Sequence, residues 1–255
     1  MKMRIGEVAA LAACAFVLAF YASAQGTYSL ELVSNFGLIA YMVVAALIGV
    51  FVAFRLGRSK FTDVSLGFAV GLVFWSIGLL LYSYSYYIVD TGLPYLSLAD
   101  VFYLLTYPAE ILGAVGVLRL CFRSLGRRVW VVVGVSGLLL YALNFVFVVP
   151  SSIEGLTAPL DVVVTILYPT LDITVFLLFL PLFFFARGGI LEKPLAFICL
   201  GAVLLALGDL FYAALSVASL YYDGHPMDLL LFFGCVSAGY GFWRQQADVE
   251  SAGEH

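Results

Sequence analysis

Long apolar stretches, separated by short connecting segments, constrain the fold of this chain more than any other feature. Each approaches or exceeds the roughly 20 residues that an α-helix needs to cross a bilayer core of about 30 Å. They lie at residues 8–24, 35–54, 64–88, 98–120, 129–149, 159–186, 195–220 and 226–243. A 64% hydrophobic fraction with only 11% charged residues is incompatible with a soluble domain of 255 residues. The sequence therefore predicts an all-α, polytopic membrane helix bundle of seven or eight transmembrane helices.

The basic residues all fall on one side of the membrane in this arrangement. They are Lys2, Arg4, Arg55, Arg58, Lys60, Arg119, Arg123, Arg127, Arg128, Arg187, Lys193 and Arg244. Because cytoplasmic loops of multi-pass proteins carry the basic excess, this asymmetry predicts a protein of the cytoplasmic (cell) membrane with its C-terminus in the cytoplasm. The lipid bilayer is the expected surrounding. A nucleic-acid partner is not expected, because the basic residues sit in short loops as topology signals.

The first apolar stretch has two interpretations. Residues 1–24 combine a basic start, a short apolar run and Ala22-Ser23-Ala24, which fits either a cleavable signal peptide or a first transmembrane helix. Cleavage would leave seven helices, and retention would leave eight. Residues 25–244 are predicted to form a single membrane helix-bundle domain. Residues 245–255 are polar and too short to fold alone, so we expect a short disordered cytoplasmic tail.

An internal repeat suggests that the bundle is built from related helical hairpins. Three outward-running spans contain Gly-x-x-x-Tyr, at Gly78–Tyr82, Gly137–Tyr141 and Gly208–Tyr212, and an Asp opens each returning span, at Asp100, Asp161 and Asp228. The spacing from Asp100 to Tyr107-Pro108 equals that from Asp161 to Tyr168-Pro169. The three Asp residues stand at the third position of their helices, where an acidic side chain answers free N–H groups and the helix dipole. We therefore expect them to cap helix starts.

Three deeper acidic residues point to a polar site inside the membrane. Glu110, Asp172 and Asp209 lie near the middle of their spans, with no Lys, Arg or His at the same depth. An ionised carboxylate there costs several kcal/mol or more without a partner. Each carboxyl group must therefore be protonated, hydrogen-bonded, hydrated in a cavity or occupied by a cation.

Helical spacing places further polar residues on the same faces as these acids. We predict a ligand or proton pocket formed by Glu110, Asp172, Asp209, Tyr107, Tyr168, Tyr212 and Asn144, with hydrogen-bond partners three and four residues apart on each helix. Pro108, Pro169 and Pro181 lie inside spans and are expected to kink their helices, the first two just before the acids. The alternative is that the acids only bridge helices, which stabilises membrane bundles by about 0.6 kcal/mol per bond on average.

The sequence lacks the residue patterns that metal sites, disulfide frameworks and common catalytic sites require. No metal site or disulfide framework is expected, because the four cysteines are scattered in or beside apolar spans without a CxxC or Cys/His cluster. The two histidines lie in a connecting loop and at the C-terminus, and no phosphate-binding glycine loop or nucleophile elbow occurs. We therefore expect no cofactor and no enzyme activity.

One stretch resembles a known family. Pro94-Tyr-Leu-Ser-Leu-Ala-Asp-Val-Phe-Tyr-Leu-Leu-Thr-Tyr-Pro108 is similar to the multi-helix integral-membrane sensory region found ahead of PAS, diguanylate cyclase or histidine kinase modules in prokaryotic signalling proteins. The similarity covers residues 65–245, and it extends through Tyr168–Asp172, Leu207–Tyr212 and Asp228–Leu230. Asp100, Tyr107, Pro108, Asp172 and Asp209 match the pattern, whereas Glu110 stands where an apolar residue is expected.

The resemblance implies a sensory or signal-input membrane domain. No output domain follows the last predicted helix, so we expect a stand-alone sensory or ligand-binding module that signals through a separate cytoplasmic or membrane protein. A proton or cation transporter or channel that uses the mid-membrane carboxylates is the first alternative. A structural membrane subunit is the second.

Overall fold

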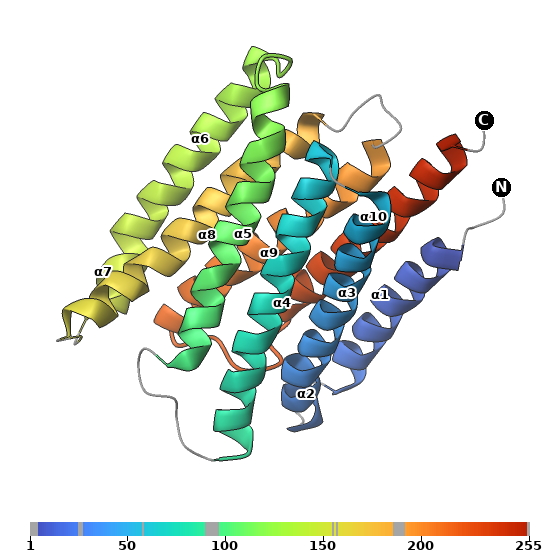
Figure 1. Ribbon diagram of the computed structural model, residues 1–255. Coiled ribbons are helices and arrows are strands. Elements are labelled where there is room, and N and C mark those ends of the chain that lie inside the picture. The colour runs from blue at the N-terminus through green and yellow to red at the C-terminus, as the bar shows by residue number, and fades with distance from the viewer. Residues whose placement is uncertain are drawn as a thin grey trace.

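The computed structural model (Figure 1) describes residues 5–24, 28–57, 59–89, 97–154, 156, 158–185 and 192–253. These ranges contain helices and no strand. The elements are α1 (Ile5–Ala24), α2 (Tyr28–Leu32), the π-helix η1 (Val33–Gly37), α3 (Leu38–Leu56), α4 (Lys60–Tyr87), α5 (Leu98–Cys121), α6 (Arg127–Leu143), the π-helix η2 (Asn144–Val148), α7 (Val149–Ser152), α8 (Pro159–Phe185), α9 (Glu192–Val217) and α10 (Asp228–Gly253). The predicted all-α, polytopic membrane helix bundle is confirmed.

The elements join into eight long helices, because α2, η1 and α3 are continuous, as are α6, η2 and α7. In the part of the chain that is described, seven of the eight are long and apolar enough to cross a membrane. The exception is α10, which packs against α1, α3 and α9. Its side chains Cys235, Ala238 and Phe242 are at most 1% exposed. Since other helices enclose α10, it needs less apolar surface than a helix that faces lipid.

The bundle has two chemically different ends. One end, which we name the basic end, carries the start of α1, the C-terminus of α10, the ends of α3, α5 and α8 and the starts of α4, α6 and α9 (Figure 1). Arg55, Arg119, Arg123 and Arg127 lie there, whereas Lys2, Arg4, Arg58 and Arg187 lie outside the described residues. The opposite end, which we name the acidic end, carries the α9–α10 loop and the starts of α5, α8 and α10.

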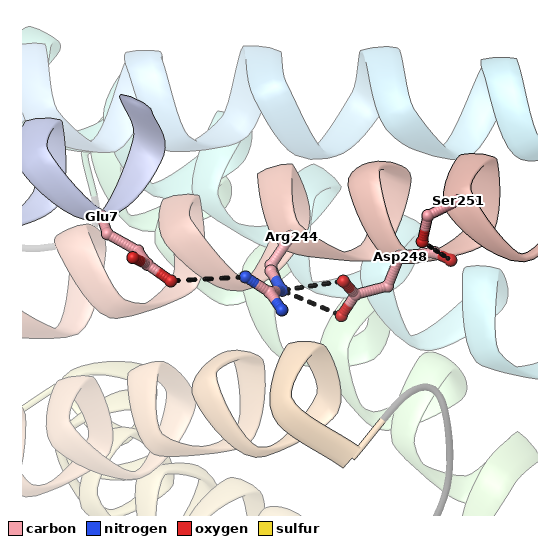
Figure 2. Close-up of polar contacts among 4 residues, drawn as sticks. All are labelled: Glu7, Arg244, Asp248 and Ser251. Carbon is pink, nitrogen blue, oxygen red and sulfur yellow. Dashed lines mark hydrogen bonds and ion pairs between the residues drawn. The ribbon is translucent and has the colours of Figure 1, made fainter. Parts of the chain in front are cut away.

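The last helix is longer than the sequence predicted. Residues 245–255 were expected to be a disordered tail, but α10 continues to Gly253, and only residues 254–255 lie outside the described part. Figure 2 shows the reason at Arg244, whose guanidinium lies 2.9 Å from Asp248 one turn later and 3.4 Å from Glu7 of α1. Ser251 Oγ donates to the Asp248 backbone carbonyl at 3.0 Å. These i, i+4 and interhelical pairs stabilise the extra turns.

The helices of the predicted hairpins pack together in pairs. α4 lies along α5, α9 along α10, and α6 and α7 contact α8. Small residues allow the closest approaches: a Cβ on Gly67 of α4 would lie 2.6 Å from the Ala109 carbonyl oxygen of α5. A Cβ on Gly201 of α9 would lie 2.8 Å from the Gly234 carbonyl oxygen of α10. Such contacts between backbones are typical of helix association in membranes, where packing replaces hydrophobic transfer as the driving force.

The half of the bundle toward the basic end is closely packed. Three aromatic rings from three helices meet there, Phe68 of α4, Phe179 of α8 and Phe242 of α10, and each is at most 1% exposed. The ring centroid of Phe68 lies 5.5 Å from that of Phe179 and 6.1 Å from that of Phe242, distances that are favourable for aromatic contact. We name these residues the phenylalanine floor.

Candidate functional site

The half of the bundle toward the acidic end contains a cavity of about 760 Å³. It reaches from the α9–α10 loop down to Phe68 of the phenylalanine floor and Glu110. Side chains from η1, α4, α5, α8, α9 and α10 form its wall. This volume falls in the range of small-molecule pockets in proteins.

The cavity brings together six of the seven residues that were predicted to form a pocket. Glu110 and Tyr107 of α5, Tyr168 and Asp172 of α8, and Asp209 and Tyr212 of α9 all line it. The seventh, Asn144, does not line the cavity in the described part of the structure. Its residue is 3% exposed, and neither polar atom of its amide has a hydrogen-bond partner there. It lies at the start of η2, while Val148 at the end of the same π-helix reaches the cavity wall.

Two tyrosines connect α5 and α8 in a reciprocal pattern. Tyr107 Oη of α5 donates to Asp172 Oδ1 of α8 at 2.7 Å, and Tyr168 Oη of α8 donates to Asp100 Oδ1 of α5 at 2.7 Å. The sequence predicted partners along one helix face, and for these two pairs that prediction is wrong. Residues three and four apart project in the same direction, so a long side chain such as Tyr reaches the neighbouring helix more readily than its own.

Glu110 occupies the deepest polar position of the cavity. It is 4% exposed, and no described residue donates a hydrogen bond to it or pairs with it as a cation. Gly71 of α4 makes room for it, because a Cβ at that position would lie 2.7 Å from Glu110 Cγ. Asp209 likewise has no hydrogen-bond partner among the described residues. A carboxyl group in this position stays neutral unless a ligand supplies the missing charge or hydrogen bonds.

The wall of the cavity combines acidic and aromatic side chains. Its acidic residues are Asp100, Glu110, Asp172, Asp209, Asp223 and Asp228, and its tyrosines are Tyr82, Tyr86, Tyr103, Tyr107, Tyr168, Tyr212, Tyr221 and Tyr222. The described residues of the wall include no Lys, Arg or His. The cavity is therefore a site of negative potential wherever its carboxyl groups ionise.

Asp228 holds the α9–α10 loop over the mouth of the cavity. Its carboxylate accepts hydrogen bonds from Ser34 Oγ of η1 at 2.6 Å, from Tyr221 Oη at 3.2 Å and from the Gly224 backbone N–H at 3.1 Å. Ser34 Oγ in turn accepts from Tyr21 Oη of α1 at 3.0 Å. Burial raises the pKa of Tyr221, and the neighbouring Asp228 carboxylate raises it further, so this hydroxyl remains a donor.

A second set of bonds lies beside the first. Tyr87 Oη at the end of α4 donates to Asp223 Oδ2 of the α9–α10 loop at 2.8 Å and accepts from Asn35 Nδ2 of η1 at 2.9 Å. The sequence did not single out Ser34, Asn35 or Asp223. Asn35 is the first residue of a predicted apolar span, Ser34 directly precedes that span and Asp223 lies in a loop, and their roles depend on contacts with residues far along the chain.

The residues predicted to cap helices stand at helix starts. Asp100 forms a capping box with Ser97, whose backbone N–H and Oγ each donate to Asp100 Oδ2 at 2.8 Å. Asp161 lies in the first turn of α8, and Asp228 is the first residue of α10. Asp100 and Asp228 also accept bonds from other helices, so they act as more than local caps.

The prolines differ in their relation to the cavity. All three stand inside helices, Pro108 in α5 and Pro169 and Pro181 in α8. Pro169 is buried in the cavity wall, Pro108 is exposed on the outside of the bundle, and Pro181 is buried toward the basic end. In the described residues no group of three or more His, Cys, Asp or Glu is placed to hold a metal ion.

No protein-family model, curated protein or solved structure matches the chain. The similarity of residues 94–108 to the sensory membrane regions of signalling proteins therefore stays a prediction. What the fold defines is a class: a multi-pass membrane helix bundle with a polar cavity at one end.

Proposed function

We propose that the chain is an integral-membrane ligand-binding protein that senses a small molecule and signals through a separate protein. The observation that carries this proposal is the cavity, which is large enough for a small organic molecule and contains two carboxyl groups, Glu110 and Asp209, with no hydrogen-bond partner among the described residues. Unsatisfied polar groups in an otherwise apolar bundle are costly, and a ligand that satisfies them offsets that cost.

The shape of the cavity favours a receptor over a pore. The cavity begins at the acidic end and stops at the phenylalanine floor, whose three rings are at most 1% exposed. An ion path requires polar or hydrated positions along its whole length. The three rings of the floor offer no polar position at their level, although Ser65 and Gln245 form a buried hydrogen bond below them, so a ligand that enters at the acidic end stays above the floor.

The basic residues give the direction of signalling. By the rule that basic loops stay inside, the basic end faces the cytoplasm and the cavity opens to the outside of the cell membrane. The ligand then arrives from outside, and the C-terminus of α10 lies in the cytoplasm.

α5 contributes residues both to the cavity wall and to the basic end. α5 carries Tyr107 and Glu110 in the cavity wall and Arg119 in its last turn at the basic end, and Arg123 lies in the turn that follows the helix. A groove of about 260 Å³ lies beside these arginines, lined also by Val115, Leu118 and Phe122. Ligand binding that shifts α5 changes this basic surface, and an acidic surface of a partner protein is the complementary reader.

A transporter of protons or cations is the second candidate. It is favoured by the position of Glu110, Asp172 and Asp209 on three different helices at mid-depth, as expected of a carboxylate relay. This function requires a second conformation in which the phenylalanine floor opens toward the basic end.

The test compares a filled cavity with an open one. Protein purified in dodecyl maltoside is screened by thermal shift and calorimetry against organic cations, anions and neutral solutes. Ala213→Phe fills the cavity from α9, and Ala142→Phe adds the same side chain to the exposed face of α6. We expect at least one solute to stabilise the wild type and Ala142→Phe but not Ala213→Phe. Proton or rubidium flux into proteoliposomes that disappears in Asp172→Asn would support the transporter instead.

A further inference from the structure

We propose that the cavity selects an organic cation, an ammonium group on a small apolar or aromatic body. This inference rests on the proposed ligand-binding function and names the chemical class of the ligand. The wall supplies three kinds of group that together recognise such a molecule: acidic side chains without counter-charges, aromatic faces and an apolar floor.

The lack of basic side chains among the described residues of the wall favours a positively charged ligand. Among the described residues of the wall there are six carboxyl groups and no basic side chain. The hydroxyl of Tyr107 already bonds to Asp172, and that of Tyr168 bonds to Asp100. In the described part of the chain, Glu110 and Asp209 have no such donor. A cationic ligand supplies the missing charge to both groups and turns their desolvation cost into an attraction, whereas an anion would leave that charge unsupplied and would be repelled by any ionised acid of the wall.

The position of Glu110 shows that this is a built site. Its side chain is 4% exposed, points to the cavity and rests over Gly71, where any larger residue would displace it. A Cβ at Gly71 would approach Glu110 Oε1 to 2.9 Å. The space is therefore shaped for the carboxyl group, and the group ends in the cavity without a donor among the described residues.

Aromatic side chains favour an ammonium group with an organic body. Trp75 and eight tyrosines line the same wall as the acids, and a cation over an aromatic face gains about 2 kcal/mol when it is desolvated. The phenylalanine floor, through Phe68, offers an apolar surface at the bottom of the cavity. Quaternary and substituted ammonium compounds satisfy both features.

A bare metal ion fits the wall less well than an organic cation. In the described residues no three acidic, histidine or cysteine side chains converge closely enough to coordinate a metal ion. A cavity of about 760 Å³ also greatly exceeds the volume of such an ion. The acids are spread around the wall, as suits a ligand that touches several of them with different atoms.

The experiment uses two probes of the same shape and different charge. Choline and its neutral isostere 3,3-dimethylbutan-1-ol are titrated into the protein in dodecyl maltoside, whose headgroup is uncharged, and benzyltrimethylammonium serves as a larger cation. We expect choline to bind at least about tenfold more tightly than the neutral isostere, and benzyltrimethylammonium to bind more tightly than choline because it covers more aromatic surface.

Variants locate the ammonium group. Glu110→Gln and Asp209→Asn should each weaken benzyltrimethylammonium binding about tenfold or more, whereas Glu110→Asp, which keeps the charge, should retain part of the affinity. Glu154→Gln and Asp161→Asn make the same chemical changes outside the cavity wall and should leave the affinity unchanged. Circular dichroism and a single size-exclusion peak verify that each variant is folded.

The outcomes separate this inference from the proposed function. Equal or tighter binding of the neutral isostere, or cation binding that survives both Glu110→Gln and Asp209→Asn, overturns the organic-cation inference and leaves a ligand-binding cavity. If no solute of any charge distinguishes the wild type from Ala213→Phe, both the ligand-binding function and this inference are wrong.

Discussion

The two halves of the bundle use the same helices for opposite purposes. Toward the basic end, Phe179 and Ala114 are fully buried and the helices meet through glycine backbones. Toward the acidic end, α4, α5, α8 and α9 surround a cavity of about 760 Å³ and touch through hydroxyl–carboxylate bonds. Close packing and open space are therefore separated along the length of the bundle, and we expect the packed half to provide most of the stability while the other half contains the proposed binding site.

The largest expected effect comes from removing part of the phenylalanine floor. Phe179→Ala deletes a ring that is 0% exposed and contacts Phe68, so we expect a loss of about 3 kcal/mol in the free energy of unfolding. Reversible unfolding in mixed SDS and dodecyl maltoside micelles measures it. Leu220→Ala, at an exposed loop position, is the control. A loss no larger than that of the control would mean that the basic half is not the stable part of the molecule.

Enlarging one side chain in each half tests the difference in packing between the two halves more directly. Ala114→Leu inserts a side chain into the packed half, where the residue is 0% exposed, and should cost about 2 kcal/mol of unfolding free energy. Ala213→Leu inserts the same side chain into the cavity wall and should be neutral or slightly stabilising, because space is available. The same unfolding assay measures both. Equal losses would show that the cavity closes in solution.

The general architecture was accessible from the sequence. Apolar length predicted the helices because it follows from local composition, while the orientation inferred from the basic loops stays a prediction. The six pocket residues on α5, α8 and α9 were found because an acid in an apolar span is conspicuous in itself. The cavity's closed floor was not predicted, since Phe68, Phe179 and Phe242 are ordinary apolar residues until three helices bring them together.

The remaining errors also have a common cause. Asp172 finds its partner on α5 and Asp228 finds one on η1, both distant in sequence, so helical periodicity alone could not pair them. α10 continues past residue 243 because Arg244 binds Asp248 and Glu7, and the second of these contacts is also distant in sequence. Local sequence patterns predict the helices and the residues that share a helix face, whereas hydrogen-bond and ion-pair partners depend on how the helices pack.

Two glycine-to-alanine substitutions distinguish a glycine that lies against a neighbouring helix from a glycine that has open space beside it. Gly67→Ala places a Cβ 2.6 Å from the Ala109 carbonyl oxygen, so α4 and α5 must separate, and we expect a net loss of about 1 kcal/mol of unfolding free energy. Gly116→Ala on α5 is the matched control, since nothing lies within 4 Å of its added Cβ. It should gain up to about 1 kcal/mol from helix propensity. The unfolding assay should therefore give opposite signs.

The smallest expected loss of unfolding free energy comes from removing one hydrogen bond in the half of the bundle toward the acidic end. Tyr168→Phe removes the donor that reaches Asp100 at 2.7 Å, and we expect a loss of about 0.6 kcal/mol, the average for such bonds in membrane proteins. The change stays small because Asp100 keeps its two bonds to Ser97. Tyr84→Phe, at an exposed position of α4, is the control. A loss above about 2 kcal/mol would mean that the polar bonds beside the cavity stabilise the bundle strongly. The packed half toward the basic end would then not be the main source of stability.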